Sequence, residues 1–213
     1  IAKMKKIERA WWNWNICQDA FNKKSCVSQN GVPEGYIFLA GQQGDCATIP
    51  TRTCTIAIDP DGATPTIFFP VINFAYRDFD DDGDGTACPP SRGQIDPAVV
   101  NSLRVQKANY IKRPYAKLKG RPMTIDYIVN ANPYYLKSCP NKKAACCDGC
   151  DNPVCEDCKG VDIYPSYGYY VMSNTGKWRP GETRVYEFGA NIEFDSEPFC
   201  PSVKYILKAV KKG

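Results

Sequence analysis

The sequence predicts a mainly β protein: an antiparallel β-sandwich of the jelly-roll or immunoglobulin-like kind, with an N-terminal amphipathic helix and a disulfide-rich insertion. Three observations predict it. Short β-branched and aromatic runs recur along the chain with Gly and Pro between them, which is typical of a sandwich. Hydrophobic residues make up 43% of the 213 residues and aromatic residues 12%, enough for a real core. Twelve cysteines can staple such a fold with disulfide bonds.

Residues 1–16 are predicted to form the helix, which we expect to end near Asn15. Its apolar residues recur at three- and four-residue spacing with charged residues between them. This stripe either packs on the parent domain or docks on a neighbouring subunit, because terminal elements are readily exchanged between protomers. The candidate subunit interface is Ile1, Met4, Ile7, Trp11 and Trp14.

Residues 17–213 are predicted to form a single sandwich domain. Pro70 requires that its strand lie at a sheet edge or contain a bulge. In the last strand the apolar residues from Val203 to Ala209 alternate with Lys204 and Lys208, so the two sets face opposite ways. The candidate strands are Tyr36–Ala40, Thr51–Ile58, Thr66–Asn73, Thr124–Val129, Val161–Tyr164, Tyr169–Met172, Arg184–Phe188 and Val203–Val210.

Two segments interrupt the strands. A short helix is expected over residues 96–108, which begin with an Asp-Pro cap. Residues 139–158 form a cysteine-rich loop with Cys-x-x-Cys pairs starting at Cys147 and Cys155. Such pairs are typical of zinc sites, but here only four residues separate them, and an extracellular setting favours disulfide bonds.

The cysteine content predicts a secreted, extracellular protein, because so many thiols form disulfides outside the cell. A start at Ile1 without a leader fits a mature form whose signal peptide has been removed. We expect local disulfide bonds within 139–158 and a disulfide bond from Cys17 to Cys26 or Cys46. A further disulfide bond through Cys200 is expected to attach the last strand to the rest of the domain. The cysteines are Cys17, Cys26, Cys46, Cys54, Cys88, Cys139, Cys146, Cys147, Cys150, Cys155, Cys158 and Cys200.

Several sequence blocks occur in a distinctive order: Trp11–Trp14, Tyr36–Gly41, Arg52–Ile56, Ile67–Asn73, Tyr167–Val171 and Pro180–Glu182. This order resembles a family of uncharacterised secreted β-sandwich proteins with ordered W-x-W, FLAG, RTCTI and IFFPVIN motifs. The resemblance implies a secreted single-domain sandwich and carries over no catalytic residue. This chain departs from the family in having Thr183 where relatives tend to have His, and in its cysteine-rich insertion.

The absence of histidine excludes whole classes of site. Ser-His-Asp and Cys-His catalysis, His-ligated metal sites and a histidine pH switch cannot be built within this chain. The formal charge of +4 is mild, so the lysines are expected to form a solvated face rather than a surface that binds polyanions or acidic polysaccharides. No apolar stretch approaches the roughly 20 residues of a membrane span.

An acidic run over residues 78–85 is the strongest single motif. Alternate carboxylates followed by glycine are typical of a loop that curls around Ca²⁺. The closing glutamate of an EF-hand is missing, so the alternatives are a looser calcium site, closed by Asp96 or a carbonyl, and a solvated acidic turn. The candidate metal ligands are Asp78, Asp80, Asp82 and Asp84.

Carboxylate pairs for glycoside hydrolysis would have to come from this run or from Glu182, Glu187 and Glu193, and no spacing singles out a pair. The thirteen tyrosines suit a sugar-stacking or protein-binding surface, although strand core explains many of them. The candidate contacts are Tyr134, Tyr135, Tyr167 and Tyr169.

These observations favour a secreted, non-enzymatic structural protein whose copies self-assemble into an extracellular filament or surface layer. The alternative is a secreted carbohydrate-binding module that is calcium-dependent. The expected partners are copies of the chain itself, and otherwise glycans, with no nucleic acid and no membrane span.

Overall fold

The computed structural model describes residues 2–18, 20, 23–42, 47–58, 65–75, 105, 110–130, 134–135, 162–163, 166–174, 176–193 and 198–212. The chain forms two compact units. The first unit comprises Ile1–Asn73, Ala108–Ile128 and Gly168–Gly213, and the second comprises Phe74–Lys107 and Val129–Tyr167. In the second unit β7 (Tyr134–Tyr135) pairs with β8 (Asp162–Ile163).

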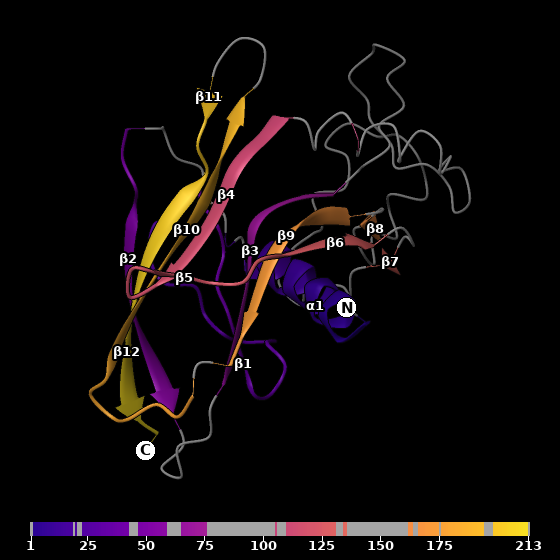
Figure 1. Cartoon of the computed structure of the whole chain (residues 1–213). Helices are drawn as coiled ribbons and strands as arrows, with labels where there is room; N and C mark the ends of the chain where they lie inside the picture. Colours follow the sequence, from indigo (N-terminus) through magenta and orange to yellow (C-terminus); the bar gives the residue numbers. More distant parts are fainter. Residues whose placement is uncertain are drawn as a thin grey trace. The chain divides into compact units, whose positions relative to one another are not determined.

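The fold is mainly β, and two sheets pack as a sandwich, as the sequence predicts (Figure 1). One sheet has the order β1-β3-β9-β6, with strands Tyr36–Phe38, Thr66–Ala75, Ser166–Ser173 and Asp126–Asn130. The other has the order β2-β12-β10-β4-β5, with β11 also paired to β10. Its strands are Thr51–Ile58, Ser202–Lys211, Thr183–Glu193, Ile111–Leu118, Arg121–Pro122 and Pro198–Phe199.

Two strand pairs are parallel, which departs from the antiparallel sandwich that the sequence predicts. β1 pairs with β3 in parallel, and so does β2 with β12. β10 is antiparallel to β12, β4 and β11. Parallel neighbours need a long connection, and here other strands supply it: β2 lies between β1 and β3 in the chain, and nine strands lie between β2 and β12.

Alternation along the strands builds the core between the sheets. In β12 the residues Val203, Tyr205, Leu207 and Ala209 are buried while Lys208 is exposed, which confirms the predicted facing. β2 matches its predicted bounds and alternates exposed and buried side chains throughout. Aromatic rings fill the centre: the Phe188 ring stacks on Phe69, with 4.1 Å between ring centroids, and also on Tyr205. Such stacking adds to the stability that burial of the rings gives.

Helix α1 (Ala2–Gln18) covers the other face of the β1-β3-β9-β6 sheet, and it ends three residues later than the sequence predicts. Rings link the two elements in series. Trp14 contacts Phe38 with 5.7 Å between ring centroids, Phe38 contacts Phe68 at 5.8 Å, and Phe68 stacks on Tyr170 at 5.8 Å. The four-stranded sheet is therefore buried on both faces, by the second sheet and by α1 (Figure 1).

The apolar stripe of α1 packs on its own domain. Met4, Ile7, Trp11 and Trp14 are all buried within this chain, while Ile1 lies outside the described residues. The indole Nε1 of Trp11 donates to the Leu39 carbonyl at 2.8 Å. In this structure the stripe is thus not exposed to a neighbouring subunit, because its apolar surface is already buried.

Pro70 occupies a local edge, as its missing N–H requires. β1 pairs with β3 only from Thr66 to Phe68. The Leu39 N–H bonds to the Phe68 carbonyl, so the even-numbered residues of β3 direct their backbone N–H and C=O groups toward β1. Pro70 has the same parity and lies beyond the last β1 partner, so the proline removes no hydrogen bond to β1.

Sequence patterning does not reveal β4. Its Lys112, Arg113 and Pro114 interrupt any alternation, and the register with β10 shifts between Gly189 and Asn191. Arg113 has a φ of 49°, the backbone signature of this bulge. Of the helix expected over 96–108 the structure describes only Val105, which is helical.

Candidate functional site

Several predicted site residues lie outside the described part of the chain. They include the candidate calcium ligands Asp78, Asp80, Asp82 and Asp84, and eight cysteines: Cys46, Cys88, Cys139, Cys146, Cys147, Cys150, Cys155 and Cys158. Within the residues that the structure describes, no three or more metal-binding side chains gather at one place. Calcium binding by the acidic run therefore stays a prediction.

The described cysteines are all in disulfide bonds. Cys26 bonds to Cys54, with 5.5 Å between their Cα atoms, and Cys17 and Cys200 are also disulfide-bonded. The Cys26–Cys54 bond rules out the predicted alternative in which Cys17 pairs with Cys26. It joins the segment after α1 to β2, two elements whose proximity no sequence pattern indicates.

The candidate tyrosines differ in exposure. Tyr167 is buried, so its ring is not available for stacking on a sugar, contrary to the prediction. Tyr134 and Tyr135 form β7, and their side chains are not described. Tyr169 is half-buried and its ring centroid lies 5.0 Å from that of Tyr127, a residue that is 40% exposed. Tyr127 and Tyr169 together form a partly accessible aromatic pair on β6 and β9.

A turn before β10 positions the best-connected carboxylate of the first unit. The Glu182 N–H bonds to the Arg179 carbonyl at 2.9 Å, and Gly181 has a φ of 83°. Pro at the second turn position and Gly with positive φ at the third are the requirements of a type II turn. The Pro180-Gly181 pair thus places Glu182 where β10 begins.

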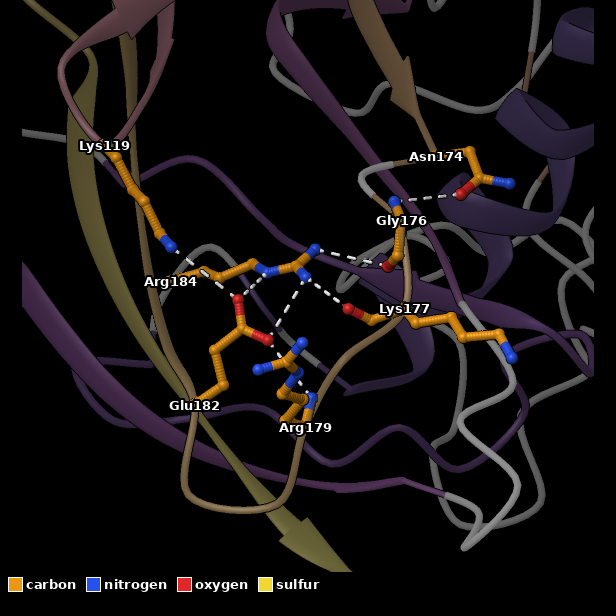
Figure 2. A network of polar contacts seen from close by, with 7 residues as sticks. All are labelled: Lys119, Asn174, Gly176, Lys177, Arg179, Glu182 and Arg184. Carbon is orange, nitrogen blue, oxygen red and sulfur yellow. Dashed lines mark hydrogen bonds and ion pairs between the residues drawn. The ribbon is translucent and has the colours of Figure 1, made fainter.

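Arg184 holds this carboxylate (Figure 2). Its Nε donates to Glu182 Oε1 at 2.7 Å and its Nη2 donates to Oε2 at 3.3 Å. The same Nη2 donates to the Lys177 carbonyl at 2.8 Å. The guanidinium lies 4.1 Å from the ring centroid of Trp178, a cation–π contact, and Lys119 Nζ adds an ion pair to Glu182 at 3.6 Å.

This network holds Glu182 in its charged form. Hydrogen bonds from Arg184 are the largest cause, and together with the Arg179 N–H and the nearby cations they lower the pKa of Glu182 to about 2. A general acid or base needs a pKa near the working pH. Glu182, which the sequence offers as one of a hydrolytic pair, is instead a fixed anion that ties the 176–182 loop to β10.

A second buried cation joins four chain segments. The Arg52 side chain is fully buried, and its Nη1 donates to Tyr205 Oη at 2.5 Å. Its Nη2 donates to the carbonyls of Ala20 and Lys23. Tyr205 Oη in turn donates to the Ala40 carbonyl at 2.9 Å. Burial, partly offset by the Arg52 charge, raises the pKa of Tyr205, so this hydroxyl remains a neutral donor.

A buried carboxylate lies between α1 and the sheet. Glu8 is fully buried, and its Oε1 accepts hydrogen bonds from Trp12 Nε1 and from Tyr170 Oη, both at 3.1 Å. Buried polar groups with such partners specify one packing arrangement. Glu8 therefore orients the helix on β9.

The six-stranded sheet has an outer face, opposite the face that packs in the core. Strand register places Thr53, Ile206 and Val185 in one row across β2, β12 and β10. Val210, on the same face, is 42% exposed. We call this surface the outer face: Thr51, Thr53, Thr55, Ala57, Lys204, Ile206, Lys208, Val210, Val185, Glu187, Tyr115 and Lys117.

Sequence reasoning missed Arg52 and Arg184, although strand parity could have located both. Arg52 has the parity of the buried Cys54 and Ile56 in β2, and Arg184 has that of the buried Tyr186 in β10. An arginine at an inward position of a strand needs acceptors. Their identity, largely loop carbonyls, could not be read from the sequence.

No known protein family, curated protein or solved structure matches this chain. Among the described residues, no helix combines the length and the apolar character that crossing a membrane demands.

Proposed function

We propose that this protein is a secreted, non-enzymatic structural subunit, and that copies of it associate into an extracellular filament or surface layer. The observation that carries the proposal is the outer face. Its central row is apolar or β-branched, and Val210 leaves 42% of its surface exposed. Exposed apolar surface of this kind favours burial against another surface.

The charges of the outer face suit a second copy. Glu187 is opposite Lys204 on β12 and Lys117 on β4, and Lys117 Nζ lies 3.3 Å from the Glu187 carboxylate. Both signs are therefore interleaved on one surface. A neighbouring copy packed on the outer face can therefore place its Glu187 against Lys204 of the first.

The buried polar groups support a role without catalysis. The buried residues Arg184, Arg52 and Glu8, together with the partly exposed Glu182, each bind groups of the chain itself, and these contacts join loops, helix and strands. A catalytic group must instead meet a substrate within hydrogen-bond reach.

Sedimentation velocity of Val210→Lys tests the outer face. The wild-type chain should sediment as a concentration-dependent series of oligomers, and the variant should remain monomeric because a lysine replaces apolar surface at the contact. The matched control is Val105→Lys, since Val105 is 50% exposed and lies outside this sheet. Equal association of both variants would contradict the outer face as the contact.

The second candidate is carbohydrate binding, favoured by the exposure of Tyr127 beside Tyr169. Aromatic faces stack on the apolar faces of sugars and leave their hydroxyls in water. A glycan-array signal that is lost in Tyr127→Ala would support this function. Loss of the signal with a chelator would add the calcium site predicted at Asp78, Asp80, Asp82 and Asp84.

A further inference from the structure

Both sheets present an edge strand on the side where the segment after α1 passes. β1 ends the four-stranded sheet and β2 ends the six-stranded sheet. An edge strand with free N–H and C=O groups is a template for pairing with another chain, and proteins commonly block such edges. The contacts of Cys26–Gln29 show that one short segment reaches both.

At the β1 edge the side-chain amide of Gln29 takes the place of a neighbouring strand. The Leu39 N–H points to β3, so the backbone N–H and C=O groups of the preceding residue, Phe38, point away from the sheet. The Phe38 N–H donates to Gln29 Oε1 at 2.9 Å, and Gln29 Nε2 donates to the Phe38 carbonyl at 3.1 Å. The Tyr36 N–H is bonded to the Pro33 carbonyl at 3.2 Å. The outward backbone groups of β1 are thus largely occupied.

At the β2 edge the Cys26–Cys54 disulfide lies where a neighbouring strand would pair. The carbonyls of Pro50 and Ile58 accept hydrogen bonds from backbone N–H groups at the two ends of β12. The odd-numbered residues of β2 therefore direct their backbone N–H and C=O groups away from β12. Cys26 Sγ, bonded to Cys54, lies 2.9 Å from the outward carbonyl of Thr53. Further along the strand, the backbone N–H and C=O groups of Thr55 and Ala57 also point away from β12.

Further contacts hold this segment in place. Trp14 Nε1 donates to the Ser28 carbonyl at 2.7 Å, and Arg52 Nη2 donates to the Lys23 carbonyl. The segment is therefore anchored by α1, by β2 and by its own disulfide. We call residues Cys26–Gln29 the edge clamp.

We propose that the β2 edge is a latent strand-pairing surface for β2 of a second copy of this chain, and that the edge clamp keeps it closed. This surface is separate from the outer face and goes beyond the proposed function. Ordered association through the face requires closed edges, because an open edge gives a competing mode of association.

The strand itself identifies the second copy as the occupant. β2 has eight residues, and its only charged side chain, Arg52, is buried. Two antiparallel copies would place Thr53 opposite Thr55 of the partner strand, with no charge repulsion between facing side chains. An outward charge is one device that blocks pairing at an edge strand; β2 has none, and the edge clamp lies against its Thr53 carbonyl instead.

The test is sedimentation velocity of an unclamped variant, Cys26→Ser with Cys54→Ser and Gln29→Leu, in the Val210→Lys background to remove association through the outer face. We expect dimers where the Val210→Lys chain alone is monomeric, because one β2 edge pairs with one partner edge. The matched control is Gln18→Leu in the same background, since the Gln18 amide donates to the Asn30 carbonyl at 3.5 Å rather than to a strand.

Thr55→Pro, added to the unclamped variant, identifies the surface. The Thr55 N–H points away from β12, so proline breaks no bond of this sheet but blocks an incoming strand. Association should return to monomer. Association that persists would overturn pairing at β2, and so would an unclamped variant that is folded by circular dichroism yet monomeric.

Two further outcomes are decisive. If the triple variant does not fold, Cys26→Ser with Cys54→Ser keeps Gln29 on β1, opens β2 and should still associate more than Gln18→Leu, and equal behaviour overturns the proposal. If the unclamped chain binds an added peptide of unrelated sequence but not itself, the second copy is the wrong occupant. Loss of wild-type association in Val210→Lys concerns the proposed function only, so the two failures remain distinguishable.

Discussion

Single residues in this protein use charge to fix loops rather than to react. Arg184 is almost fully buried, yet it has a bidentate carboxylate partner, two loop carbonyls and the face of Trp178. A buried guanidinium with partners on every side is costly to disturb, because removing one partner leaves an uncompensated charge. The 176–182 loop therefore depends on one side chain of β10.

The Glu182 carboxylate should make stability depend on pH in the acid range. Its pKa is lowered from 4.5 to about 2 in the folded state, so its stabilisation is present above pH 4.5 and is lost as pH falls toward 2. Glu182→Gln should lower the free energy of unfolding at pH 7 by about 1–3 kcal/mol, the range for hydrogen bonds to charged groups. Urea denaturation at several pH values measures this difference, which should shrink between pH 4.5 and 2.

Glu187→Gln is the matched control for that measurement. Its ion pair with Lys117 joins partly exposed side chains, and such pairs contribute at most about 1 kcal/mol. An equal loss for both variants, or a Glu182→Gln difference that does not change with pH, would contradict the role given to Glu182.

At the scale of elements, the strands and the helix follow from patterning, while their partners do not. The alternation of β2 and β12 predicts which side chains are buried, and the spacing of Trp11 and Trp14 predicts the helix. Patterning does not predict β4, because its bulge places charged residues and a proline inside a strand. Patterning also does not predict the parallel pairing of β2 with β12, because this pairing joins segments that are far apart in the sequence.

Helix α1 should contribute strongly to the stability of the sandwich. Trp11 is fully buried and its Nε1 bonds to the Leu39 carbonyl, so Trp11→Ala should cost about 3–5 kcal/mol, the range for large buried aromatic residues. Lys6→Ala, an exposed position of the same helix, should change stability by less than about 0.5 kcal/mol. Chemical denaturation measures both. A small effect of Trp11→Ala would mean that α1 is not part of the cooperative unit.

At the scale of the whole molecule, the class of fold is readable from the sequence and the candidate surfaces are not. Cysteine content and strand-like runs predict a disulfide-bonded sandwich, because both are local or compositional signals. The outer face and the edge clamp arise from register and from a contact between Cys26 and β2, which depend on tertiary pairing. They also suggest complementary roles. The outer face is open for association with another copy, whereas the edge clamp prevents association through the β2 edge.

The most direct test of self-assembly is electron microscopy of the full wild-type chain at neutral pH, with and without a calcium chelator. Regular filaments or layers are the predicted result, and their loss with chelator would assign the acidic run at residues 78–85 to assembly. Dispersed monomers in every condition would contradict the structural role and favour sugar binding instead.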